Sequence, residues 1–292
     1  FMRAFSDWNC PTFPAGIIAK TDIKIGGVAG YSYYSGVTEL ICENCVNKGD
    51  ITTVGKLSAT DAMKSGVQIG GILGRCQITG SSDGIHMVMT KCSNEGNITM
   101  NESDGPTYNF VGGVIGTYSV VSTTISDCSN SGNIIKNGSS TVAMFMGGIV
   151  GNIYRDAASA SSISRCVNTG KIGVYDASSV AEVAAGGIIG NASGIKDKAM
   201  TLAVSDCVNN GNIDRFNTVY NNKCNSYAGG IIGVIGRRHQ TTIEPYVNVT
   251  VSNCKNTAQI IFNQFSGFET FNENSTDISF TGGIIGLSYA TN

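Results

Sequence analysis

The chain has 292 residues, of which 14% are charged and 38 are glycine. Ordinary globular proteins carry about 25% charged residues and about 7% glycine, so this chain is short of charge and rich in residues that permit tight turns. Its net charge of −2 and its lack of any apolar run near the length of a membrane span argue against a nucleic-acid partner and against direct insertion into a membrane.

The first 25 residues precede the regular part of the sequence. Within them, Cys10 is followed by Ala15-Gly16-Ile17, which looks like a degenerate copy of a motif that recurs further along. We therefore interpret residues 1–25 as a degenerate N-terminal coil or cap.

Residues 26–286 are built from one repeat that contains two alternating motifs. The first is Gly-Gly-aliphatic-aliphatic-Gly, which starts at Gly26, Gly70, Gly112, Gly147, Gly186, Gly229 and Gly282. The second is Cys-x-Asn-x-Gly-x-Ile, which starts at Cys45, Cys92, Cys128, Cys166, Cys207 and, with alanine in place of glycine, Cys254. The motifs keep their length while the segments between them vary, which marks those segments as loops.

Each repeat contains three short runs typical of β-strands, for example Phe145–Ile153, Ser161–Asn168 and Lys171–Tyr175. No stretch has a convincing helical period. Because such short strands cannot bury their apolar faces alone, successive repeats must stack on one another. We predict an all-β fold, a right-handed parallel β-solenoid of six to seven coils with three short strands per coil and long variable loops. Two coils of roughly 20 residues per repeat are the alternative.

Stacking turns each motif position into a column. The isoleucines are expected to form an interior ladder: Ile51, Ile98, Ile134, Ile172, Ile213 and Ile260. The asparagines are expected to form an amide ladder that satisfies buried turn backbone: Asn47, Asn94, Asn130, Asn168, Asn209 and Asn256. We read the six motif cysteines as buried free thiols, although adjacent coils nearly provide the spacing that a disulfide needs. The glycine of the second motif is expected to supply a positive φ.

These units resemble the GLUG-type repeat of bacterial surface proteins, whose units run Gly-Gly-Leu-Val-Gly, then a cysteine-containing strand, then a Gly-x-Val/Ile strand. The resemblance covers Gly26 to Gly286. The sequence departs from that pattern in its long inter-strand segments and in Cys-x-Asn-x-Gly-Asn-Ile, which replaces the usual Cys-Tyr-Ala-Thr-Gly-x-Val. GLUG-type repeats also occur in non-catalytic regions of some IgA1-cleaving metallopeptidases. The resemblance implies an extracellular, cell-surface or secreted location and an adhesive or spacer role, and it implies no reaction.

Few residues could hold a metal ion. A metallopeptidase needs His-Glu-x-x-His, whereas the two histidines, His86 and His239, are followed by Met and Gln. Cys42 and Cys45 form one Cys-x-x-Cys without a second pair at zinc-site spacing. We therefore expect neither a metal nor a cofactor.

The residues that precede the motif cysteines allow two interpretations. They are Asn44, Lys91, Asp127, Arg165, Asp206 and Asn253. Asp127 and Asp206 would lie two coils apart, which superficially suits the paired carboxylates of a polysaccharide lyase or hydrolase built on a β-helix. Asp156 and Asp176 could add further acids to such a groove. Arg165 lies between the pair, however, so the alternating charges favour a surface ion-pair ladder.

The Gly-Gly strand is apolar on both faces. One face would carry the residue before the paired glycines and the second aliphatic residue after them, such as Ile69 and Leu73. The other face would carry the first aliphatic residue after the glycines, such as Ile72. We expect one face to fill the interior and the other to be covered by the variable segments, including Phe262–Phe271, with a partner chain as the alternative cover.

The leading hypothesis is a non-enzymatic extracellular adhesion or spacer module of a larger bacterial surface protein, joined to further domains of its parent chain. Its partner would be a host or bacterial surface glycan or protein, with Tyr31, Tyr33 and Tyr34 as the ligand-binding candidates, although an N-terminal cap would use these tyrosines equally well. Residues 287–292 are interpreted as the truncated C-terminal end of a coil. The alternative function is the carbohydrate-active enzyme.

Overall fold

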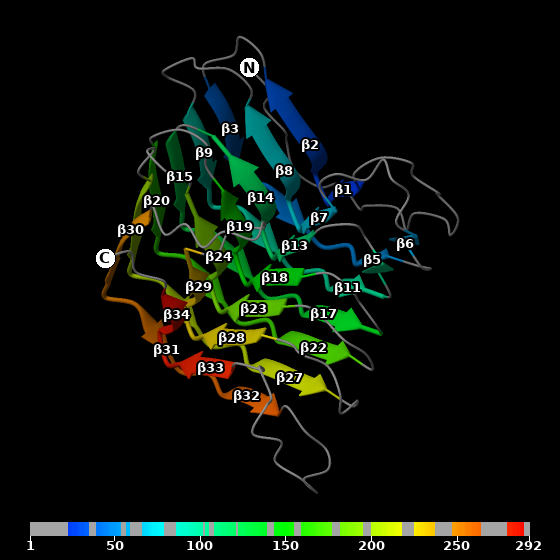
Figure 1. Ribbon diagram of the computed structural model, residues 1–292. Helices are drawn as coiled ribbons and strands as arrows, with labels where there is room; N and C mark the ends of the chain where they lie inside the picture. The colour runs from blue at the N-terminus through cyan, green and yellow to red at the C-terminus, as the bar shows by residue number, and fades with distance from the viewer. Residues whose placement is uncertain are drawn as a thin grey trace, which may run out of the picture.

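The computed structural model describes residues 23–34, 39–53, 57–58, 66–78, 86–101, 103–104, 108–120, 122–138, 143–154, 159–176, 182–194, 200–217, 225–236, 247–263 and 279–288. All regular elements within these ranges are strands, 34 in number (Figure 1). The same ranges contain no helix long and apolar enough to cross a membrane.

Five parallel sheets run along the molecule. Each of the first six coils contributes one strand to every sheet, and the last described turn contributes one strand to each of two sheets. Sheet A contains β1 (Ile23–Gly26), β7 (Val67–Gly70), β13 (Tyr108–Gly112), β18 (Ala143–Gly147), β23 (Glu182–Gly186), β28 (Asn225–Gly229) and β33 (Ser279–Gly282). Sheet B contains β2 (Ala29–Tyr34), β8 (Leu73–Ile78), β14 (Ile115–Ser119), β19 (Val150–Tyr154), β24 (Ile189–Ser193), β29 (Ile232–Ile235) and β34 (Ile285–Ser288).

The other three sheets have six strands each. Sheet C contains β3 (Glu39–Glu43), β9 (His86–Thr90), β15 (Ser122–Ser126), β20 (Ser159–Ser164), β25 (Met200–Ser205) and β30 (Val247–Ser252). Sheet D contains β4 (Val46–Asn47), β10 (Ser93–Asn94), β16 (Ser129–Asn130), β21 (Val167–Asn168), β26 (Val208–Asn209) and β31 (Lys255–Asn256). Sheet E contains β5 (Ile51–Thr53), β11 (Ile98–Met100), β17 (Ile134–Asn137), β22 (Ile172–Asp176), β27 (Ile213–Asn217) and β32 (Ile260–Asn263). A further short pair joins β6 (Leu57–Ser58) to β12 (Ser103–Asp104).

The register shows one coil per repeat. Ile98 pairs with Ile51 of the preceding repeat and with Ile134 of the following one. The backbone carbonyl of each motif cysteine from Cys45 to Cys207 accepts a hydrogen bond, 2.8–3.0 Å long, from the amide that follows the next motif cysteine. The parallel β-solenoid is thereby confirmed, and the alternative of two coils per repeat is wrong.

Each coil has five strands rather than the predicted three, because two corners divide the longer runs. The run Phe145–Ile153 is split at Gly148 and Ile149 into β18 and β19. The run Ser161–Asn168 is split at Arg165 into β20 and β21. The variable segments enter every coil at the same two positions, between sheets B and C and between sheets E and A.

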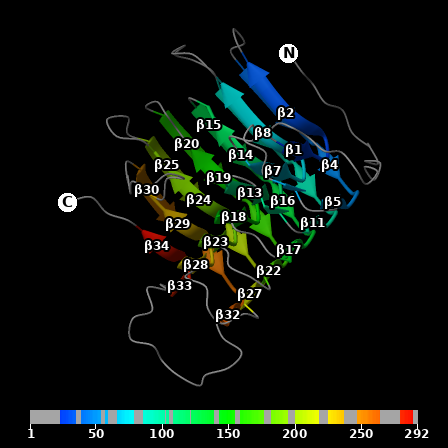
Figure 2. The same cartoon turned by 45° about the vertical axis from the view of Figure 1, so that its right-hand side comes forward.

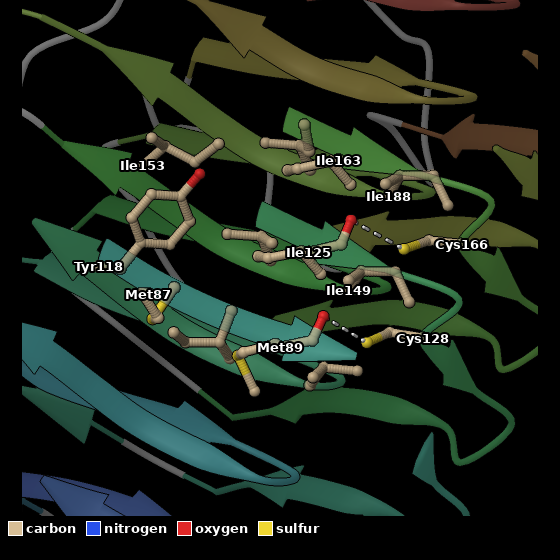
Figure 3. Close-up of a cluster of buried hydrophobic side chains, with 14 of the residues drawn as sticks. Met87, Met89, Tyr118, Ile125, Cys128, Ile149, Ile153, Ile163, Cys166 and Ile188 are labelled. Carbon is tan, nitrogen blue, oxygen red and sulfur yellow. Dashed lines mark hydrogen bonds between the residues drawn. The ribbon is translucent and has the colours of Figure 1, made fainter. Parts of the chain in front are cut away.

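The buried hydrophobic residues form three clusters, of which the two larger ones fill the coils. One lies between sheets B and C and includes Leu73, Met87 and Cys92, and Figure 3 shows part of it. The other lies between sheets A and E and includes Ile69 and the isoleucine column, which is buried from Ile51 to Ile213. Each coil therefore has two packed arms, and the sheets that build them run side by side along the stack (Figure 2).

The Gly-Gly motif forms the corner at which the two arms meet. A Cβ atom on Gly70 would overlap the carbonyl oxygen of Leu73, one on Gly71 would overlap the side chain of Asn94, and one on Gly74 would lie 2.6 Å from the carbonyl oxygen of Ile25. The same contacts recur along the stack. The three glycines are thus required by close backbone and side-chain approach at a tight corner.

This corner corrects the expectation of a straight Gly-Gly strand with a separately covered outer face. The chain turns at the glycines, so that Ile72 and Leu73 both enter the cluster between sheets B and C, while Ile69 enters the other. Both columns are buried, as expected, but they are buried by the core itself. Residues 264–271 of the Phe262–Phe271 insertion lie outside the described residues.

The first described strand begins at Ile23 and the last ends at Ser288. Residues 1–22 lie outside the described residues, so the interpretation of residues 1–25 as a cap stays a prediction. The same holds for residues 289–292 at the other end.

Candidate functional surfaces

The asparagine column forms an amide ladder at the junction of the two arms. Each Nδ2 donates to Oδ1 of the next asparagine, at 2.7–2.9 Å from Asn47 to Asn256. Each Nδ2 also donates to the carbonyl oxygen two residues further along its own turn, as Asn94 does to Gly96 at 2.8 Å. These amides are buried in the first five coils, so the ladder satisfies turn backbone that water does not reach.

The glycine of the second motif does not have a positive φ, which corrects that expectation. A Cβ atom on Gly132 would overlap the carbonyl oxygen of Gly96 in the preceding coil, so close stacking of the turns explains the glycine. The left-handed residue is instead the one that precedes the motif cysteine. All six residues of that column have φ between 51° and 56°: Asn44, Lys91, Asp127, Arg165, Asp206 and Asn253.

The left-handed conformation gives a prediction for Lys91. Left-handed backbone costs about 1–2 kcal/mol per residue for ordinary side chains, and asparagine tolerates it better. Asn44 and Asn253 already occupy this position in other coils. We expect Lys91→Asn to raise the free energy of unfolding by about 0.5–1 kcal/mol, measured by urea titration. The exposed Lys48→Asn serves as the control, and an equal gain in both variants would contradict the explanation.

The same corner carries an ion pair. Arg165 donates from Nε and Nη2 to the two carboxylate oxygens of Asp127, both at 2.7 Å. This hydrogen-bonded pairing lowers the pKa of Asp127 and raises the pKa of Arg165, to which Asp206 contributes at longer range. Asp127 is therefore engaged by the arginine that separates it from Asp206, as the ion-pair interpretation predicts.

We expect Asp127→Asn to change the melting temperature only slightly at neutral pH. Both residues of the pair are solvent-exposed or nearly so, and asparagine keeps the left-handed turn. Because the pKa of Asp127 is lowered in the folded state, the pair stabilises the fold above the ordinary aspartate pKa and loses its effect as the pH falls through the lowered value. Melting curves across this acidic range should converge for the two proteins, and a constant difference would contradict the assignment.

The motif cysteines form a column of thiols beside the left-handed corner. The eight described cysteines are free: Cys42, Cys45, Cys76, Cys92, Cys128, Cys166, Cys207 and Cys254. The thiol of Cys128 donates to the carbonyl oxygens of Ser126 at 3.3 Å and of Met89 in the preceding coil at 3.6 Å (Figure 3). Off the column, burial raises the pKa of Cys76 to about 12, which makes its thiol a poor nucleophile. Cys10 and Cys224 lie outside the described residues.

Thiol titration tests this column. Denatured, unreduced protein should react with Ellman's reagent at the six motif cysteines at least, because these thiols pack as small apolar groups. A reduced sample gives the total for comparison. Reaction of two thiols or fewer would show that adjacent coils are joined by disulfides.

The predicted tyrosine site lies at the N-terminal end of sheet B. Tyr31 is 41% exposed, with Lys24 Nζ 4.4 Å from its ring centroid and its hydroxyl donating to Gln77 Oε1 at 3.2 Å. Tyr33 and Tyr34 belong to β2, but their side chains lie outside the described residues. Tyr31 therefore offers one exposed aromatic face, and the grouping of the three tyrosines stays a prediction.

A second buried ladder occupies the outer side of the corner between sheets A and B, and sequence reasoning missed it. Asn191 Nδ2 donates to Asn152 Oδ1 at 2.7 Å, and Asn152 Nδ2 donates to Thr117 Oγ1 at 3.1 Å. Beside it on sheet A the rings of Phe110 and Phe145 stack with centroids 5.7 Å apart. The available signal was an uncharged polar residue directly after the third glycine of the Gly-Gly motif in three successive repeats, at Thr117, Asn152 and Asn191.

The remaining predicted groups are not brought together among the residues that the structure describes. His86 lies in β9, where its Nδ1 is 2.9 Å from Ser122 Oγ, whereas His239 and Asp156 lie outside the described residues. Asp176 ends β22. Among the described residues, no three His, Cys, Asp or Glu side chains are grouped so that they could hold a metal ion.

Comparisons with known proteins give no match. No family model, curated protein or solved structure matches this chain.

Proposed function

We propose that the protein is a non-enzymatic, extracellular adhesion or spacer module of a larger bacterial surface protein, with GLUG-type repeats. The observation that carries the proposal is that the asparagines, glycines and cysteines of the two motifs all serve coil stacking. The asparagines bond from coil to coil, the glycines permit close approach, and the thiols bond to turn carbonyls. Repeats that stack in this way build a rod, and a spacer needs that shape.

The enzyme alternative gains no specific support from the arrangement of acids. A catalytic pair needs one carboxylate free to accept or donate a proton at the substrate. Asp127 has both oxygens bonded to Arg165, and the bond holds its pKa low. We therefore propose binding without turnover.

Tyr31 is the described residue best placed to contact a glycan ligand. Its ring is exposed, and Lys24 and Gln77 hold it in place. An exposed aromatic face stacks on the apolar face of a sugar ring. Phe280, at the opposite end of the stack and 43% exposed, provides a matched control.

A glycan array combined with a reducing-sugar assay tests the proposal. We expect binding to one or more glycans without release of reducing ends, and we expect Tyr31→Ala to weaken that binding more than Phe280→Ala does. Release of reducing ends that persists through purification would overturn the proposal in favour of a carbohydrate-active enzyme.

A further inference from the structure

The six motif cysteines place their sulfur atoms in one row inside the stack. Each thiol from Cys92 to Cys254 donates to a backbone carbonyl at the same position of the preceding coil, at 3.3–4.0 Å. Each thiol from Cys45 to Cys207 also donates to the carbonyl two residues earlier in its own coil, at 3.2–3.7 Å. Because the contacts repeat, the six side chains share one orientation.

The coil spacing sets the distance between neighbouring sulfur atoms. Side chains that share one orientation on adjacent parallel strands are separated by the strand spacing, about 4.8 Å. Backbone hydrogen bonds such as the one from Ser129 N to Cys92 O, at 2.9 Å, keep this spacing from coil to coil. The row is therefore a line of six sulfur atoms with five equal gaps.

This spacing suits a bridging metal ion better than a disulfide. A disulfide needs Cβ atoms about 3.8 Å apart, so each bond would have to draw two coils together by about 1 Å. The bond from a d10 metal ion to a thiolate sulfur is about 2.3 Å long in zinc sites, so two such bonds in line span about 4.6 Å. An ion between two sulfurs thus fits without moving the coils.

Two ligands in line select the class of ion. Zinc takes four ligands in a tetrahedron, and among the described residues no three His, Cys, Asp or Glu side chains are grouped to hold an ion. Cu(I) needs only two, because it is a soft ion that thiolates select and its filled d shell permits linear coordination. We propose that the row binds Cu(I) as a chain, with one ion in each gap between the thiolates of adjacent coils. The inference goes beyond the proposed function and does not depend on it.

A continuous chain keeps the buried charge small. Each thiol loses its proton on binding, so six thiolates and five Cu(I) ions leave one net negative charge spread along the row. Three separate thiolate pairs with one ion each would leave three negative charges, which an apolar core opposes more strongly. The inner sulfurs therefore bridge two ions each. Copper enters and stays as Cu(I), so the step involves no oxidation or reduction.

The turn backbone tolerates the loss of the thiol protons. The carbonyl oxygen of Ser126, which accepts from the thiol of Cys128, also accepts from the amide of Lys91 at 3.1 Å. The corresponding carbonyl oxygens of Ser164 and Ser205 likewise have an amide donor, at 3.1 and 3.0 Å. These carbonyls therefore stay hydrogen-bonded when metal replaces the proton, and no buried acceptor loses its last partner.

The surroundings of the row shield bound copper. Figure 3 shows Cys128 and Cys166 beside Ile149 and Ile188, which belong to the same buried cluster. An apolar shell of this kind limits the access of solvent to a metal ion. At the end of the row Cys254 is only partly buried, so the gap between it and the preceding coil is the point of entry.

Copper stoichiometry tests the proposal. Full-length protein is unfolded in urea, refolded without oxygen in the presence of excess Cu(I), and separated from unbound ions by gel filtration. We expect at least five Cu(I) ions per chain, one for each gap. Zn(II) in the same procedure should not be retained to a comparable extent, because the row offers two ligands where zinc needs four.

Three variants count the gaps. Cys128→Ala removes one sulfur but two gaps, so it should bind two Cu(I) ions fewer than the wild type. Cys254→Ala, at the end of the row, should bind one fewer. Cys76→Ala, buried but outside the row, is the matched control and should bind as many as the wild type. Far-UV circular dichroism checks folding, and the partly buried Cys254 keeps the test available if Cys128→Ala does not fold.

X-ray absorption at the copper edge gives an independent readout. We expect two sulfur neighbours per ion and the next copper ion about 4.8 Å away. Fewer than five retained ions, equal losses in Cys128→Ala and Cys76→Ala, or equal losses in Cys128→Ala and Cys254→Ala would overturn the proposal. Three sulfur neighbours per ion would also overturn it, because they would show a compact cluster instead of a chain.

Discussion

Replacing Asn168 by alanine should lower the free energy of unfolding by about 3–5 kcal/mol, because it interrupts the amide ladder at its middle. The substitution removes one hydrogen bond from each of three buried groups, of which Asn130 Nδ2 keeps its bond to Gly132 O and Asn209 Oδ1 keeps its bond from the amide of Gly211. Asn130 Nδ2 loses the acceptor at 2.8 Å, Asn209 Oδ1 loses the donor at 2.8 Å, and the carbonyl oxygen of Gly170 loses the donor at 2.9 Å. The carbonyl oxygen that loses its side-chain donor costs about 1–3 kcal/mol, and each of the other two lost hydrogen bonds costs about 0.5–1.5 kcal/mol.

Urea unfolding followed by circular dichroism measures the effect. The control is Asn133→Ala, which removes an exposed amide that accepts one backbone hydrogen bond, from Lys171 at 3.0 Å. We expect this control to lose about 0.5–1 kcal/mol, the net value of a solvent-accessible hydrogen bond. Similar losses in the two variants would contradict the view that the buried ladder stabilises the stack.

The repeat explains why the fold class could be predicted from the sequence. A column in a solenoid is a motif position read across repeats, so invariant Ile and Asn at fixed spacing predict stacked ladders before any strand is placed. The pairing of Ile98 with Ile51 and Ile134 shows the columns directly. One coil per repeat follows from the same pairing.

The two corners were harder to find, because neither carries an ordinary turn signal. Apolar residues continue through the Gly-Gly corner, so the stretch around Ile149 and Val150 has the pattern of one strand buried on both faces. At the other corner two repeats have Lys91 and Arg165, which rarely adopt a left-handed backbone. Four of the six residues in that column are Asn or Asp, which was the signal for positive φ.

The second ladder shows how a partial column escapes detection. Thr117, Asn152 and Asn191 are only three of seven equivalent positions, and Val234 and Leu287 continue the column as apolar residues. A position that changes chemistry along the stack has no constant type in the sequence. Its burial follows from the geometry of the corner, which the sequence pattern does not specify.

Replacing Gly148 by alanine should destabilise the protein at least as strongly as the loss of Asn168, by about 4–6 kcal/mol. The added Cβ would overlap the carbonyl oxygen of Gly187 and the side chain of Asn168, both buried. The backbone carbonyl cannot move without breaking the pairing of adjacent coils. The amide must therefore leave its place in the ladder, so one methyl group combines overpacking with three lost hydrogen bonds.

The chain contains a matched control for this change. Gly283 occupies the same motif position in the last described turn, where a Cβ atom would meet nothing within 4 Å. Gly283→Ala should change the free energy of unfolding by no more than about 0.5 kcal/mol, as surface substitutions usually do. Urea titrations of the two variants give the comparison, and equal destabilisation would show that backbone conformation, rather than contact with asparagine, requires the glycine.

The double variant Gly148→Ala with Asn168→Ala separates the two causes. Both single changes remove the same ladder hydrogen bonds, so their combined cost should fall short of the sum by the value of those bonds, about 3–5 kcal/mol. A residual cost should persist, because the new Cβ still overlaps the carbonyl oxygen of Gly187. Strict additivity would mean that the glycine and asparagine columns act independently, which the geometry of the corner does not allow.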